Sequence, residues 1–229
     1  SYLVQLKDIK IPNLPVEEYT KEERMRLQKA FGYTYEEYRS SIGKMALNGV
    51  EATASMGIDT PLAVLSHEHQ PLFNYFKQLF AQVTNPPIDC IREEIVTSTS
   101  VYVGRDGNLL EEEPKNCQVL KINNPILTNT DMLKIKNMKV EGFKAVTVPI
   151  TYYKSAPLDR AMDRLFVEVD RAHRAGANIL ILSDRGVDEN HVAIPSLLAV
   201  SAVHQHLVKT KKRTSLAIIL ESGEPREVH

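Results

Sequence analysis

The stretch Asn178-Ile179-Leu180-Ile181-Leu182-Ser183 decides the fold. Four successive apolar residues without polar alternation are typical of a parallel strand that is covered on both faces. Before it, residues 158–175 repeat apolar side chains at steps of three and four, and Gly176 stops that helical pattern. After it, Pro195 opens a second helix to about residue 208, which is apolar almost all round. Residues 158–208 are therefore predicted to form helix, strand and helix.

Two further apolar stretches flank this unit. Residues 145–150 and 216–220 are both predicted to be strands. Alternating strands and helices favour parallel pairing with right-handed crossovers, so the fold class is α/β with parallel-sheet βαβ units. Residues 222–225 look like the opening turn of a helix that is cut off at His229. We therefore expect a bare apolar or edge-strand surface near 216–220, through which a homodimer could form.

The N-terminal part is predicted to be helical. Thr20 and Glu23 have capping-box spacing inside a helix within 15–30, and Phe31-Gly32 ends it. A second helix runs from Thr34 to about residue 47. We expect residues 1–50 to form an N-terminal helical linker or hairpin, and residues 51–229 to form the α/β domain, truncated at its C-terminal end.

The middle of the chain is less regular. Residues 51–61 are predicted to be a loop and residues 62–65 a short strand. A helix is predicted from Pro71 until Asn85-Pro86-Pro87 stops it, with a broad apolar stripe over residues 72–80. A further helical stretch is expected at 89–96 and a short helix at 132–138. Residues 105–108 carry a turn signal between apolar residues, as in a hairpin.

Charge and cysteine content exclude several classes of function. The chain has 28 Lys and Arg against 29 Asp and Glu, a balance that argues against a nucleic-acid or anionic-membrane binder. Two cysteines, Cys90 and Cys117, cannot supply the four thiolates of an iron–sulfur cluster or an all-Cys zinc site. They are best explained as free thiols in a reducing compartment, so we expect a cytoplasmic location. No apolar run approaches the roughly 18 residues of a membrane span, and no Gly-rich phosphate loop occurs.

Two loops follow the carboxyl ends of predicted strands, where α/β proteins place functional groups. They are residues 184–194 and the segment from Glu221 onward. Asp184, Arg185 and His191 in the first loop form the best local candidate for acid–base or metal chemistry. The alternative is an ion-paired loop that stabilises itself or a neighbouring domain. The residues leave both readings open.

Several long segments resemble glutamate synthase large chains. They are Ser55-Met56-Gly57-Ile58-Asp59-Thr60-Pro61-Leu62-Ala63-Val64-Leu65-Ser66, residues 76–89 with Ile91-Arg92-Glu93-Glu94, residues 176–187, residues 194–200 and Glu221-Ser222-Gly223-Glu224-Pro225-Arg226-Glu227-Val228-His229. The similarity runs from about Phe31 to the end, and it identifies the chain as similar to the central domain of that family.

The resemblance implies a place within a larger enzyme that makes glutamate from glutamine and 2-oxoglutarate. An amidotransferase domain releases ammonia, and a flavin-binding barrel domain with an iron–sulfur cluster reduces the imine. The central domain between them is α/β with an incomplete, barrel-like architecture. It holds both domains in register near the ammonia tunnel. FMN and the iron–sulfur cluster are then cofactors of the parent enzyme, with none bound by this chain, and the partners are the amidotransferase and FMN-binding domains.

No catalytic, cofactor-binding or metal-binding residue carries over from the family, because the matching segments contain none of its nucleophile, flavin or cluster motifs. We expect two loops to face the neighbouring domains or the tunnel, with the candidate residues Ser55, Met56, Asp59, Thr60, Asp184, Arg185, His191 and Glu221. Two rival hypotheses remain. One is a free-standing enzyme that uses the Asp184, Arg185 and His191 loop, and the other is a short natural binding module.

Overall fold

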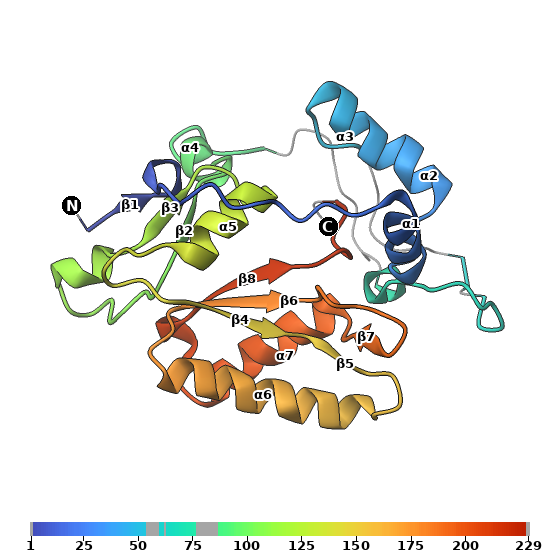
Figure 1. Ribbon diagram of the computed structural model, residues 1–229. Coiled ribbons are helices and arrows are strands. Elements are labelled where there is room, and N and C mark those ends of the chain that lie inside the picture. The colour runs from blue at the N-terminus through green and yellow to red at the C-terminus, as the bar shows by residue number, and fades with distance from the viewer. Residues whose placement is uncertain (1, 54–59, 62, 77–86, 228–229) are drawn as a thin grey trace.

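A computed structural model describes residues 2–53, 60–61, 63–76 and 87–227 (Figure 1). Its centre is a sheet of three parallel strands in the order β4 (Ala145–Pro149), β6 (Ile179–Ser183) and β8 (Ala217–Glu221). Ile179 lies opposite Ala145 on one side and Ala217 on the other. The predicted α/β class with parallel βαβ units is confirmed, and the strands within the described residues do not close into a barrel.

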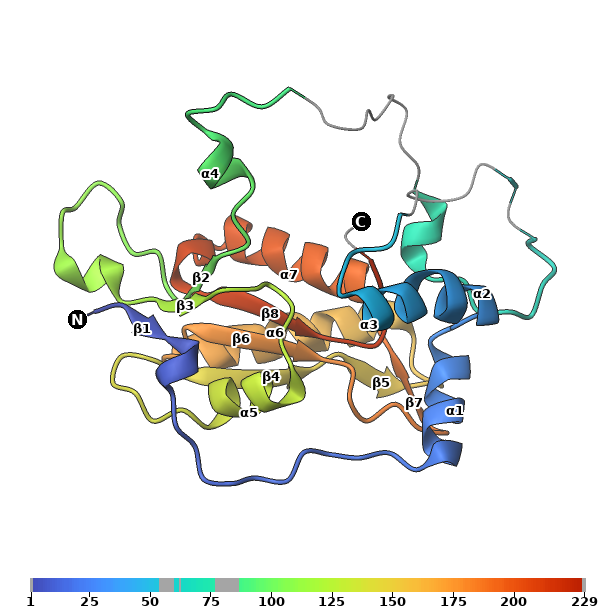
Figure 2. The ribbon, with the colours of Figure 1, turned by 90° about the horizontal axis from the view of Figure 1, so that it is seen from above.

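Helices and a second sheet cover the two faces of this central sheet (Figures 1 and 2). The helices α6 (Leu158–Arg174) and α7 (Ser196–Lys209) pack on one face. The other face carries α5 (Asn129–Asn137) and a sheet of β1 (Val4–Gln5), β3 (Leu120–Ile122) and β2 (Val101–Val103). Further elements beside these layers are η1 (Leu6–Asp8), η5 (Arg213–Ser215) and the antiparallel pair β5 (Thr151–Tyr153) and β7 (His191–Ala193).

The position of β6 between two cores explains why its sequence is apolar without alternation. Leu180 and Leu182 belong to the core under α6 and α7, whereas Ile179 and Ile181 belong to the core under α5 and β3. All four side chains are fully buried. Because successive strand residues point to opposite faces, burial of both faces requires apolar residues at every position.

The N-terminal helices form largely as predicted. Helix α1 (Lys21–Ala30) begins after Thr20, whose side chain forms a capping box with Glu23, and it ends before Gly32 at φ 66°. It starts later than the predicted residue 15. The second helix comprises α2 (Tyr35–Glu37), a π-helical turn η2 (Tyr38–Ile42) and α3 (Gly43–Asn48). No helix within the described residues is long and apolar enough to cross a membrane.

Two predictions for the middle of the chain are wrong. Val64 and Leu65 lie in a turn, 88% and 91% exposed, and form no strand, while Leu62 lies outside the described residues. The helix expected from Pro71 is only a short 3₁₀ turn, η3 (Leu72–Tyr75), and Leu79 and Phe80 lie outside the described residues. The turn ends at Phe76, whose backbone is extended, and Tyr75 and Phe76 are exposed.

The structure of segment 87–138 also differs in part from the prediction. Strands β2 and β3 pair antiparallel, but residues 104–119 connect them through η4 (Pro114–Cys117), so the predicted turn at 105–108 is not a tight hairpin. Helix α4 (Glu93–Val96) covers only the end of the predicted 89–96, whereas α5 confirms the short helix expected near 132–138.

The C-terminal strand is not bare. Strand β8 is an edge of the central sheet, as predicted, but Leu216 and Ile219 are buried. Both faces of β8 contribute to the two cores, so the expected exposed apolar surface is wrong. Residues 223 and 224 form a bend, and the described part of this segment contains no helical turn, which corrects the helix start predicted there.

Candidate functional site

A charged network lies where β6 and β8 end. Ser183 and Glu221 are the last residues of these strands and lie opposite each other. The Ser183 hydroxyl donates to Glu221 Oε2 at 2.6 Å, and Arg185 Nε donates to Oε1 at 2.9 Å. Lys136 Nζ, from α5, reaches both carboxylate oxygens at 2.9 Å. Glu221 therefore joins the loops that follow β6 and β8 to α5, on the face of the sheet opposite α6 and α7.

Glu221 is held in its charged form. Burial alone would raise its pKa, but hydrogen bonds from Ser183, Lys136 and Arg185 outweigh burial and hold the pKa below its usual range. Its side chain is 10% exposed, so these partners replace most of its water.

Arg185 uses its remaining guanidinium nitrogens to hold the N-terminal segment. Nη1 donates to the Tyr19 hydroxyl at 2.8 Å and to Glu17 at 3.1 Å, and Nη2 donates to Asn129 Oδ1 at 3.0 Å. Every guanidinium nitrogen of Arg185 therefore has a protein acceptor, counting its bond to Glu221. Arg185 is consequently a tether between residues 17–19 and the carboxyl end of the sheet.

Asp184 and Glu224 form a buried acidic pair beside this network. Asp184 is 5% exposed and accepts from the Gly223 amide at 3.1 Å. Burial raises the pKa of Asp184, and the nearby Glu224 and Glu221 carboxylates act in the same direction, although Ser222 and Gly223 oppose them. Glu224, equally buried, accepts from the Ser196 amide at 2.5 Å, where α7 begins.

His191 belongs to a different local arrangement. It lies on β7, its Nδ1 is 2.9 Å from Asp188 Oδ1, and its ring lies 4.4 Å from that of Tyr153. Within the described part of the chain, no hydrogen bond links His191 to Asp184 or Arg185. The three residues proposed from the sequence as an acid–base cluster therefore have separate partners.

The other loop proposed from the sequence contributes less. Ser55, Met56 and Asp59 lie outside the described residues, and Thr60 is exposed. Their expected position facing a neighbouring domain stays a prediction.

Arg226 forms a second tether that the sequence analysis did not identify. Its side chain is 5% exposed, and its guanidinium lies 3.8 Å from the centre of the Tyr33 ring. Nη1 donates to Glu37 Oε1 at 2.6 Å, and Nη2 donates to the carbonyl of Phe31. The Tyr33 hydroxyl in turn donates to the Gly223 carbonyl at 2.6 Å, so the C-terminal segment is fixed to the helical segment near residue 31.

Sequence reasoning missed these partners because they lie far apart in the chain. Arg226 and Glu37 are separated by 189 positions, and Arg185 and Glu17 by 168. No spacing rule relates such residues. Glu224 and Arg226 did lie within a segment that resembles the family, and that was the one available signal.

The cysteines of this chain do not fit an iron–sulfur cluster. Cys90 and Cys117 are unpaired and exposed, and two cysteines cannot ligate a cluster that requires more thiolates. Among the described residues, no group of three His, Cys, Asp or Glu side chains is arranged to hold a metal ion. No chemical step is therefore assigned to a bound cofactor here.

Asp184 provides a pH test. A carboxyl group with a raised pKa in the folded state binds protons more tightly than in the unfolded state, so stability falls as pH rises through its ordinary value of 3.8 toward the folded value. Asparagine cannot titrate. We therefore expect Asp184→Asn to gain stability relative to the wild type as the pH rises from about 3 to about 7. Urea unfolding across this range measures it. A constant difference between the two proteins would contradict the assignment.

Comparison with known proteins identifies the domain. A family model described as the glutamate synthase central domain matches residues 26–229. The chain is 46% identical over 202 residues to the glutamate synthase (NADPH) large chain of Bacillus subtilis, covering 88% of this chain and 13% of the relative. It is 40% identical over 243 residues to the glutamate synthase (NADH) of Saccharomyces cerevisiae, covering 100% and 11%.

A third relative is named for a different electron donor. The ferredoxin-dependent glutamate synthase 2 of Synechocystis is 39% identical over 209 residues, covering 90% of this chain and 13% of the relative. The chain thus spans only 11–13% of the length of these three proteins. With most of its residues matched by the family model, the chain belongs to the glutamate synthase central domain family.

Proposed function

We propose that this domain is the connecting part of a cytoplasmic glutamate synthase, which makes glutamate from glutamine and 2-oxoglutarate. It holds an amidotransferase domain and an FMN-binding domain in register near the path of ammonia, and it supplies no catalytic group itself. FMN and the iron–sulfur cluster belong to the other parts of that enzyme. Residues 1–50 act as the helical linker and residues 51–229 as the connecting domain.

The observation that carries this proposal is the closed charge network at the carboxyl end of the sheet. In α/β enzymes this edge offers free polar groups to substrates. Here Arg185 and Glu221 are saturated by each other and by Lys136, Tyr19 and Ser183. Such an edge fixes the position of chain segments and leaves these groups unavailable for substrate.

The second support is that both tethers fix the N-terminal part of the chain to segments that lie far away in the sequence. Arg185 holds residues 17–19, and Arg226 holds residues 31–37. Segments on either side of a connecting domain that are fixed to one rigid sheet keep a constant separation. Constant separation matters for ammonia transfer, because a gap would admit water and release ammonia before it reacts.

The experiment is a coupling assay in the full-length protein. We expect Arg226→Met to keep glutamine hydrolysis and flavin reduction, but to hydrolyse about twofold or more glutamine per glutamate formed, because small displacements of reacting partners cost large factors. The exposed Arg171→Met is the matched control and should keep the wild-type ratio. An unchanged ratio in a folded Arg226→Met protein would contradict the connecting role.

The rival enzyme hypothesis makes a separate prediction. If the 184–191 loop performed chemistry, His191→Ala would lower activity while the coupling ratio stayed constant. We expect this substitution to change neither quantity, since within the described residues the His191 side chain makes its hydrogen bonds and ring contacts to Asp188 and Tyr153 alone.

A further inference from the structure

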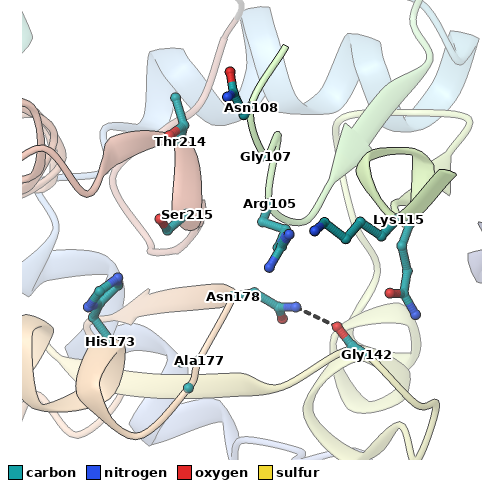
Figure 3. Close-up of a pocket in the computed structure, with 12 residues that line it drawn as sticks. Arg105, Gly107, Asn108, Lys115, Gly142, His173, Ala177, Asn178, Thr214 and Ser215 are labelled. Carbon is teal, nitrogen blue, oxygen red and sulfur yellow. Dashed lines mark hydrogen bonds between the residues drawn. The ribbon is translucent and has the colours of Figure 1, made fainter. Parts of the chain in front are cut away.

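An open pocket lies at the opposite end of the central sheet from the charged network. It has a volume of about 740 Å³, within the range of small-molecule sites. Residues just before the three parallel strands line it, namely Gly142, Asn178 and Ser215, together with the connection between β2 and β3. Figure 3 shows this arrangement, with Arg105 and Lys115 on one side and His173 on another.

The pocket walls are fixed by hydrogen bonds. Asn178 Nδ2 donates to the Gly142 carbonyl at 2.6 Å, and its Oδ1 accepts from the Lys144 amide at 2.8 Å. The Asp106 amide donates to the Thr214 carbonyl at 2.9 Å, which joins the β2–β3 connection to the start of β8. The pocket is therefore bounded by elements that hold each other in place.

The pocket is lined by two basic side chains, Arg105 and Lys115, and by the imidazole of His173. Among the described residues, no carboxylate lines it. Lys115 pairs with Glu113, which lies outside the lining, whereas Arg105 has no ion-pair partner among the described residues. In Figure 3 the Arg105 guanidinium and the Lys115 ammonium extend toward each other. Arg105 therefore places a positive charge without an ion-pair partner among the described residues beside the Lys115–Glu113 pair, and such a charge favours a bound anion.

We propose that this pocket binds a small oxyanion with two negative charges, either a phosphate or a dicarboxylate. Arg105 supplies a planar fork of donors and Lys115 a second positive charge. The hydroxyl groups of Thr214 and Ser215, which also line the pocket, can donate to the remaining oxygens. The site is independent of the connecting role, because it lies at the amino ends of the strands and shares no residue with the two tethers.

The test is a titration of the full-length protein with inorganic phosphate and, separately, with succinate, followed by calorimetry. We expect saturable binding of at least one anion, weakened by added salt, with a dissociation constant about tenfold higher in Arg105→Gln and in Lys115→Gln. Binding of phosphate alone assigns a phosphate group as the ligand, and binding of succinate alone assigns a dicarboxylate. Anion sites elsewhere contribute equally to the wild type and to each variant.

Controls separate the pocket from general charge effects. Lys44→Gln removes an exposed positive charge on α3, at the other side of the molecule (Figures 1 and 2), and should leave the dissociation constant unchanged. The thermal unfolding of Arg105→Gln without anion should match that of the wild type, because Arg105 is exposed. Absence of saturable binding, or equal binding by wild type and Arg105→Gln, would overturn the proposal.

Discussion

Replacement of Arg226 by methionine is expected to lower the free energy of unfolding by about 2–4 kcal/mol. Methionine keeps much of the apolar stem but leaves the Phe31 and Gly32 carbonyls and the Glu37 carboxylate without their shared donor. The Tyr33 ring also loses its stacked cation at 3.8 Å. The cost is large because the Arg226 side chain is buried and water cannot replace it easily.

The matched control for this prediction is Arg171→Met. Arg171 pairs with Glu168 on the surface of α6, and its side chain is 66% exposed, so we expect a loss of about 0.5 kcal/mol or less. Urea unfolding measures both variants, and amide hydrogen exchange should show faster exchange of residues 31–43 only in Arg226→Met. Equal losses in the two variants would show that the Arg226 contacts do not stabilise the fold.

The second large effect is expected for Glu221→Gln. Glutamine keeps the shape but removes the charge that Lys136, Arg185 and Ser183 surround, and two cations then face each other across a neutral amide. We expect a loss of about 2–3 kcal/mol in the free energy of unfolding near neutral pH. The N-terminal segment that Arg185 holds should loosen with it.

The stability loss caused by Glu221→Gln is expected to depend on pH. Because the pKa of Glu221 is lowered in the folded state, its stabilisation is present above the ordinary value of 4.5 and disappears as pH falls through the folded value. The difference between wild type and Glu221→Gln should therefore shrink in acid, opposite to the trend expected for Asp184→Asn. Glu168→Gln, on the exposed side of α6, is the control and should show a small difference throughout. A difference for Glu221→Gln that stayed constant into acid would contradict the lowered pKa.

The C-terminal half of the fold could be predicted because local pattern and tertiary environment agree there. The apolar steps in residues 158–174 match the buried face of α6, and the unbroken apolar run of β6 matches burial on both sides. Capping boxes at Thr20 and Thr128 act within one helical turn, so helix starts of this kind depend only on neighbouring residues.

The misjudged segments are those in which local preference had no packing to support it. Val64 and Leu65 have strand-forming side chains, but they reach no sheet and stay exposed. Leu72 to Tyr75 make one 3₁₀ turn where a full amphipathic helix was predicted. A short apolar run becomes a strand or a helix only when another surface buries it.

The candidate site was likewise predicted only in part. Position at a strand end correctly brought Asp184, Arg185 and Glu221 to one edge of the sheet, because carboxyl ends of parallel strands meet there. The sequence could not show that Lys136, Glu17 and Glu37 complete the ion pairs, nor that the His191 ring contacts Asp188.

The amino-acid order by itself determined the α/β class, the parallel strands and the family, since these follow from periodicity and from long continuous segments. Only the tertiary structure decided which charges are neutralised, as at Arg226, and which have no ion-pair partner among the described residues, as at Arg105. The physical reason is that a charge interacts over distances in space, and chain folding brings together groups that no sequence spacing relates.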